Sequence, residues 1–107
     1  MRYAQLRILC MFDLPVMTKK QQQQYRVFRK TLIENGFTML QYSVYYRIVQ
    51  NRSAAQKFAP ILKKMIPEDG DIRLLYVSEK QFNDMLLLVG RKSKQEQAIG
   101  NEKMVII

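Results

Sequence analysis

The sequence predicts an α+β fold of the ferredoxin-like type, with the element order βαββαβ and both helices on one face of the sheet. Two observations indicate this fold: strand-like apolar runs alternate with segments whose apolar residues recur at helical spacing, and capping residues mark the helix starts. A third observation concerns the first strand, which is apolar on both faces. Because the two helices cover one face only, we expect a homodimer through the open face of the sheet.

The expected strands are short and rich in aromatic and β-branched residues, as strands in half-buried sheets usually are. The two central ones are joined by a tight turn at Tyr42 and Ser43. The strands are expected over residues 6–12, 37–41, 44–49 and 72–77, and a fifth over residues 85–89.

Helix starts are indicated by a polar cap followed three residues later by glutamine. Thr18 with Gln21 predicts the first helix, and Gly36 is suited to end it. The same pattern recurs at Ser53 and Gln56 for the second helix and at Ser78 and Gln81 for a short helical turn. Pro60 predicts either a kink in the second helix or a helix that begins just before it.

The chain divides into a ferredoxin-like domain over residues 1–90 and a polar linker with a C-terminal strand over residues 91–107. The last four residues are apolar and would form an unpaired strand in solution. We expect this strand to pair with a sheet edge, across the dimer.

The net charge of the chain and the length of its apolar runs indicate which class of partner it has. The 107 residues carry 18 Lys and Arg against 9 Asp and Glu, a net charge of +9, which favours nucleic acid as the partner. The longest apolar runs are far shorter than the roughly 20 residues of a membrane-spanning helix, so no membrane role and a cytoplasmic location are expected. Cys10 has no partner cysteine and is expected to be a buried structural thiol.

Asp13 is the candidate catalytic and metal-binding residue, because it ends an apolar strand in a chain without histidine. Its carboxylate suits Mg²⁺, with Mn²⁺ as the alternative ion, and two copies near a dimer axis could share the ion with a substrate phosphate. The alternative is a turn residue whose carboxylate accepts backbone hydrogen bonds before Leu14 and Pro15.

The first helix carries the candidate nucleic-acid-binding residues. Lys19, Arg26 and Lys30 lie roughly opposite its apolar side, and Arg29 lies between the two faces. A charged helix face is often only solvated, but Glu34 is the single acid on this helix. Uncompensated charge favours contact with phosphates.

Three tyrosines, Tyr42, Tyr45 and Tyr46, could stack on bases as sheet aromatics do in RNA-recognition folds. The accompanying basic-Gly-aromatic motif is absent, so we interpret them mainly as packing residues. An RNA-binding module is therefore the weakest of the alternatives.

Four motifs in order resemble the small CRISPR-associated adaptation proteins of the Cas-two family, in their type II form, over about residues 2–90. The motifs are Met11-Phe12-Asp13-Leu14-Pro15, Tyr25-Arg26-Val27-Phe28-Arg29-Lys30 with Gly36-Phe37, Gln41-Tyr42-Ser43-Val44-Tyr45, and Gly70-Asp71-Ile72-Arg73.

The resemblance implies a ferredoxin-like homodimer that joins dimers of the Cas-one integrase and holds a short DNA duplex, the prespacer, for insertion into the CRISPR repeat array. It also implies a Mg²⁺-dependent endonuclease acting on RNA or double-stranded DNA, with Asp13 as the metal ligand. Spacer acquisition is thus the expected function, and a free-standing metal-dependent nuclease is the alternative.

Overall fold

The computed structural model describes residues 5–67 and 69–90. Its elements follow the predicted order, β1 (Leu6–Asp13), α1 (Lys19–Glu34), β2 (Thr38–Gln41), β3 (Val44–Val49), α2 (Arg52–Gln56), α3 (Phe58–Lys63), β4 (Asp71–Ser78) and α4 (Glu79–Asn83). The sheet has the order β2-β3-β1-β4, and every pair of neighbouring strands is antiparallel. This is the arrangement of a ferredoxin-like fold, so the predicted fold class is confirmed.

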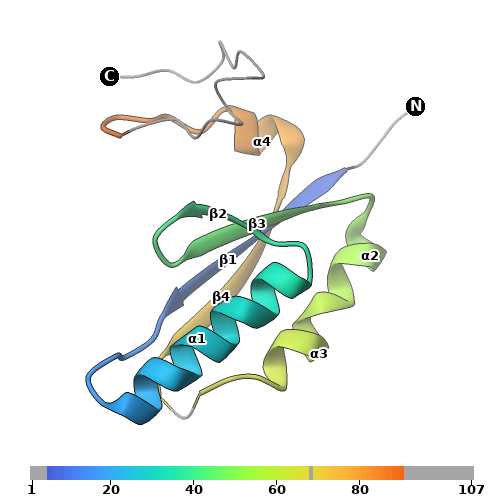
Figure 1. Cartoon of the computed structure of the whole chain (residues 1–107). Coiled ribbons are helices and arrows are strands. Elements are labelled where there is room, and N and C mark those ends of the chain that lie inside the picture. Colours follow the sequence, from blue (N-terminus) through green and yellow to red (C-terminus); the bar gives the residue numbers. More distant parts are fainter. Residues whose placement is uncertain (1–4, 68, 91–107) are drawn as a thin grey trace.

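Alternation along β1 divides the sheet into two faces. Ile8, Cys10 and Phe12 point into the core, which α1, α2 and α3 cover (Figure 1). Leu9, Met11 and the other odd-numbered residues of β1 belong to the opposite face, called the open face below. Within the core, the ring of Phe12 contacts those of Phe28 and Tyr45.

Local signals position α1 as predicted. The hydroxyl of Thr18 accepts a hydrogen bond from the Gln21 N–H, and the Gln21 side chain accepts one from the Thr18 N–H, which completes the capping box. Gly36 follows the helix with φ +84°, the left-handed conformation that favours glycine at this place.

The second helical region is broken in two at Lys57. Its cap is Asn51, whose side chain accepts a hydrogen bond from the Ala54 N–H at 2.8 Å, so the predicted cap at Ser53 is wrong. Both residue types cap well, and the asparagine comes first along the chain. α3 begins two residues before Pro60, in agreement with a helix that begins just before the proline.

The short helix α4 folds against one end of the open face. Ser78 and Gln81 form the predicted capping box, and the ring of Phe82 lies 5.4 Å from that of Tyr46 on β3. Residues 85–89, predicted as a fifth strand, contain only an isolated bridge at Leu87, so this prediction is wrong.

The expected C-terminal strand lies in residues 91–107, outside the described residues. Among the described residues, no helix is long and apolar enough to cross a membrane.

Candidate active site and nucleic-acid surface

Asp13 is the last residue of β1 and is exposed on the open face. The pairing of β1 with β4 places it directly opposite Asp71, the first residue of β4. Directly opposite residues of an antiparallel pair project from the same face, so the two carboxylates are neighbours. Asp71 belongs to one of the four motifs of the sequence, but nothing in the sequence indicated it as a site residue.

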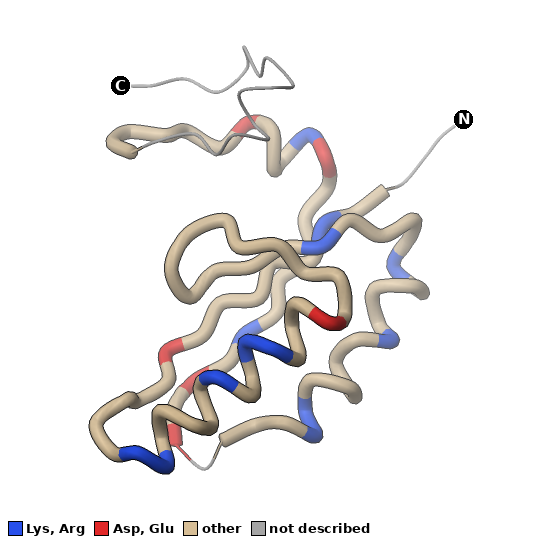
Figure 2. Tube along the Cα trace, in the orientation of Figure 1, with Lys and Arg blue, Asp and Glu red and all other residues tan. Residues whose placement is uncertain are grey.

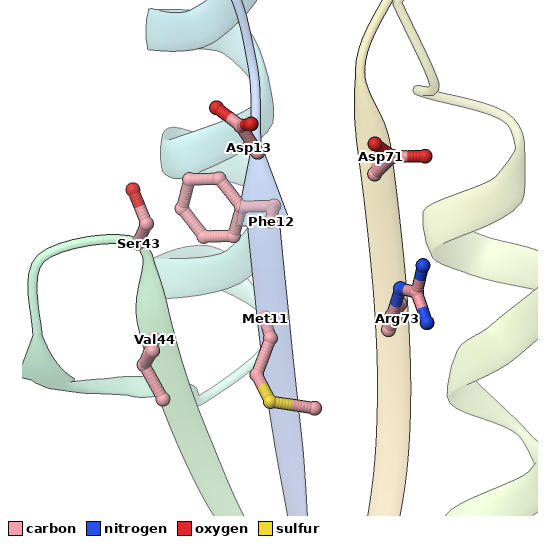
Figure 3. A pocket seen from close by; sticks show the side chains of 7 residues that line it. All are labelled: Met11, Phe12, Asp13, Ser43, Val44, Asp71 and Arg73. Atoms are coloured by element: carbon pink, nitrogen blue, oxygen red, sulfur yellow. The ribbon is translucent and has the colours of Figure 1, made fainter.

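A hollow of about 310 Å³ opens beside the two carboxylates (Figure 3). Arg73 lines it from β4, where it lies opposite Met11, and Ser43 lines it from the turn between β2 and β3. Ser43 has φ +65°, an uncommon conformation for a residue with a side chain. The hollow therefore combines two carboxylates, a hydroxyl and a guanidinium.

The charged groups of the hollow have no partners among the residues that the structure describes. Within the described residues, the side chains of Asp13, Asp71 and Arg73 form no hydrogen bond or ion pair. The turn interpretation of Asp13 needed its carboxylate to accept backbone hydrogen bonds, and the described residues provide none. These side chains are thus available to a ligand.

The donor set suits a hard cation, since Mg²⁺ is bound through one or two carboxylates together with water and substrate phosphate. The described residues contain no group of three or more His, Cys, Asp or Glu that could hold a metal ion. Asp13 and Asp71 would therefore supply two oxygen ligands and leave the other positions to water and substrate.

The predicted nucleic-acid-binding residues of α1 differ in their contacts with the rest of the protein. Lys19, Arg26 and Lys30 are exposed, and their side chains have no ion-pair partner within the described chain. Arg29 instead donates a hydrogen bond of 2.8 Å from Nε to the hydroxyl of the buried Tyr45. Arg29 therefore fastens α1 to the sheet, and its remaining N–H groups are left for other contacts.

The cations of the helical layer and the carboxylates of the hollow occupy opposite faces of the sheet. Lys and Arg follow α1, α2 and α3, whereas Asp13 and Asp71 lie where β1 ends and β4 begins (Figure 2). The basic side chains of α1 do not line the Asp13 hollow. The structure does not bring them together, and a phosphate at Asp13 needs a cation on the open face.

The tyrosines do not form a stacking platform on the sheet. Tyr45 is 1% exposed in the core, and Tyr46 is covered by Phe82 and by the guanidinium of Arg7, 5.1 Å from its ring centre. Tyr42 is 86% exposed, but it lies in the turn before β3. The packing interpretation of Tyr45 and Tyr46 agrees with the structure.

A profile of the family "CRISPR associated protein Cas2" matches residues 6–85, which include β1, the hollow and all helices. This chain belongs to the Cas2 family. The resemblance noted in the sequence is thereby confirmed.

Relatives agree with this assignment. Proteins named "CRISPR-associated endoribonuclease Cas2" include one from Ligilactobacillus salivarius (strain UCC118), 42% identical over 84% of this chain and 89% of its own length. Another, from Acidovorax ebreus (strain TPSY), is 42% identical over 94% of this chain and 99% of its own. A solved structure, "Crystal structure of cas2", matches 85% of this chain and 93% of its own with a TM-score of 0.61 and 19% identity, a likeness that shows the fold alone.

Proposed function

We propose that this Cas2 protein acts in CRISPR adaptation as the dimeric, double-stranded-DNA-binding subunit of the spacer integration complex formed with the Cas-one integrase. The observation that carries this proposal is the set of exposed cations on α1, Lys19, Arg26 and Lys30, which have no ion-pair partner within the described residues of a chain of net charge +9. Incoming DNA can have any sequence, and contacts to phosphates supply affinity without reading bases.

The homodimer is supported by the open face of the sheet. α4 covers one end of that face, while Ile48 and Leu75 remain 46% and 49% exposed. Apolar side chains gathered on a sheet face are typical of a surface that a partner covers, and two-fold pairing covers both copies at once.

The DNA-binding part is tested by the salt dependence of duplex affinity. Replacing Arg26 and Lys30 by alanine should reduce the slope of log affinity against log salt by roughly 0.9 for each lost phosphate contact. A matched variant, Lys63→Ala with Lys64→Ala, removes the same charge from the end of α3. Equal slopes for the wild type and the α1 variant would contradict the assigned footprint.

A second function, metal-dependent endonuclease activity, is supported by the hollow. Asp13 and Asp71 would hold Mg²⁺ or Mn²⁺, and such an ion polarises a phosphoryl oxygen and lowers the pKa of bound water. The relatives' name, endoribonuclease, adds RNA to duplex DNA as a candidate substrate.

One pair of assays separates the two functions. Asp13→Ala should abolish phosphodiester cleavage while spacer integration with the Cas-one integrase continues, if the protein is mainly a DNA-holding scaffold. Loss of integration together with cleavage would make the metal site part of the adaptation reaction. Cleavage by the variant at the wild-type rate would reject Asp13 as its centre.

A further inference from the structure

Arg73 is the one Lys or Arg among the described residues that line the hollow of the two carboxylates. It lies two residues after Asp71 on β4 and lines the same hollow as Asp13 (Figure 3). It nevertheless pairs with neither carboxylate, nor with any other described residue. An arginine left unpaired beside two acids is available for a ligand that brings its own negative charge.

The other arginine on this part of the open face is held elsewhere. Among the described residues, alternation places two arginines of β1 and β4 on the open face, Arg7 and Arg73. Both Nε and Nη2 of Arg7 donate to the Glu79 carboxylate, at 2.7 and 3.0 Å, and its guanidinium lies 3.9 Å from the centre of the Phe82 ring. Arg7 is thus committed to holding α4, at the other end of β1 from Asp13.

The charge balance of the hollow indicates which ligand Arg73 receives. Two carboxylates and one guanidinium leave one negative charge, which repels a phosphodiester. A divalent cation on the carboxylates changes this to one positive charge, and a phosphodiester monoanion then neutralises it. Because the cation reverses the net charge of the hollow from negative to positive, the phosphate contact depends on the cation.

From this arrangement we infer that Arg73 binds the non-bridging oxygens of a phosphodiester at the Asp13 hollow, and that it does so when a divalent cation occupies Asp13 and Asp71. The inference rests on the proposed metal site. The planar guanidinium offers two parallel N–H donors to two phosphate oxygens, a geometry that lysine cannot supply. Arg73 would therefore position the nucleic-acid backbone on the face of the sheet that the helical cations do not reach.

The test measures binding of a short DNA duplex by fluorescence anisotropy, with Ca²⁺ as a hard cation or with EDTA, over a range of salt. Arg73→Gln removes the charge, and Arg73→Lys keeps the charge but not the paired donors. Lys57→Gln is the matched control, since Lys57 is an exposed cation beside α2 on the helical layer. Sedimentation of each variant reports its oligomeric state.

The wild type and Lys57→Gln should bind the duplex more tightly in Ca²⁺ than in EDTA. Arg73→Gln should lose this gain, and its salt slope in Ca²⁺ should fall by roughly 0.9 per lost contact. Arg73→Lys should keep the slope and recover only part of the gain. A duplex with neutral methylphosphonate linkages should bind wild type and Arg73→Gln equally in Ca²⁺.

An Arg73→Gln variant with the wild-type slope in Ca²⁺ would overturn the inference. So would dissociation of its dimer, because Arg73 would then bind a carboxylate of the second copy. If Ca²⁺ does not change wild-type binding, the proposed metal site fails, and the salt slope of Arg73→Gln still decides whether Arg73 contacts phosphate.

Discussion

A β-carbon added to Gly70 would lie 2.5 Å from the carbonyl oxygen of Asp13. Gly70 precedes β4 and has φ +110°, so it combines a conformation that suits glycine with a close backbone approach. The absence of a side chain lets β4 begin against the end of β1. The next residue, Asp71, is the one that pairs with Asp13 across the two strands.

Gly70→Ala should therefore lower the free energy of unfolding by about 1–3 kcal/mol, because the new methyl group meets backbone that cannot move aside cheaply. Gly90→Ala is the control. Gly90 also has a positive φ, of +148°, but its added carbon meets only the tip of the Leu87 side chain, at 3.2 Å. Urea unfolding that shows an equal or larger loss for Gly90→Ala would contradict this explanation.

Asp71→Asn should affect duplex binding in opposite directions with and without a divalent cation. In EDTA the substitution removes a negative charge from the hollow, so the duplex should bind more tightly. In Mg²⁺ the variant loses a metal ligand, and Mg²⁺ affinity measured by calorimetry should fall roughly tenfold, about 1.4 kcal/mol. At a Mg²⁺ concentration that fills the wild-type site but not the weakened one, the variant lacks the cation and should bind the duplex less tightly than the wild type.

Asp84→Asn is the control for the opposite changes in duplex affinity that are expected for Asp71→Asn in EDTA and in Mg²⁺. Asp84 is an exposed carboxylate that pairs with Lys80 at 2.7 Å, away from the hollow. Its replacement should leave Mg²⁺ binding unchanged. A change in the same direction in both media for Asp71→Asn would indicate that Asp71 acts through general charge and not as a ligand.

Local patterns were sufficient to predict most of the fold. The capping boxes at Thr18 and Ser78 act over three residues, and the apolar side of α1 predicted from its spacing is the side that is buried, at Phe28 and Leu32. Such signals depend on neighbours in the chain and survive in a single sequence. The end of the first strand could also be predicted, because Asp13 interrupts an apolar run.

The complete hollow was not predictable in the same way. Asp71 joins Asp13 only through the register of β1 against β4, a pairing of segments far apart in the chain. Register depends on which faces are buried in the folded sheet and on backbone approach at Gly70. The separation of the α1 cations from the Asp13 hollow was not predictable for the same reason, since which face of a strand meets the helices is a tertiary property.

The contact between Arg7 and Glu79 should control local opening of α4. Glu79→Gln weakens the bidentate pair but leaves the Phe82 ring over Arg7, so protection of α4 amides from hydrogen exchange should fall roughly fivefold, about 1 kcal/mol. Arg7→Met should cost more, because it removes both the ion pair and the cation–π contact.

Lys80→Gln breaks the exposed pair with Asp84 in the same helix and should change exchange little. A comparable loss of protection in this variant would show that charge within α4, and not its attachment to β1, determines its opening.

Cys10 should make stability fall with rising pH in the alkaline range. Burial raises the pKa of its thiol to about 12, whereas an unfolded cysteine has a pKa of roughly 8.5. The stabilisation from the protonated folded thiol is full below roughly pH 8.5 and is lost as the pH rises toward 12. One proton lost only by the unfolded chain gives a slope of up to about 1.4 kcal/mol per pH unit.

Urea unfolding of wild type and Cys10→Ala at pH 8, 9 and 10 measures this effect. The variant should be less stable at pH 8, by roughly 1 kcal/mol for the lost packing, and the difference should shrink as the pH rises. Tyrosine and lysine titrations are common to both chains and cancel in the comparison. Parallel pH curves for the two proteins would show that the thiol is open to water in the folded state.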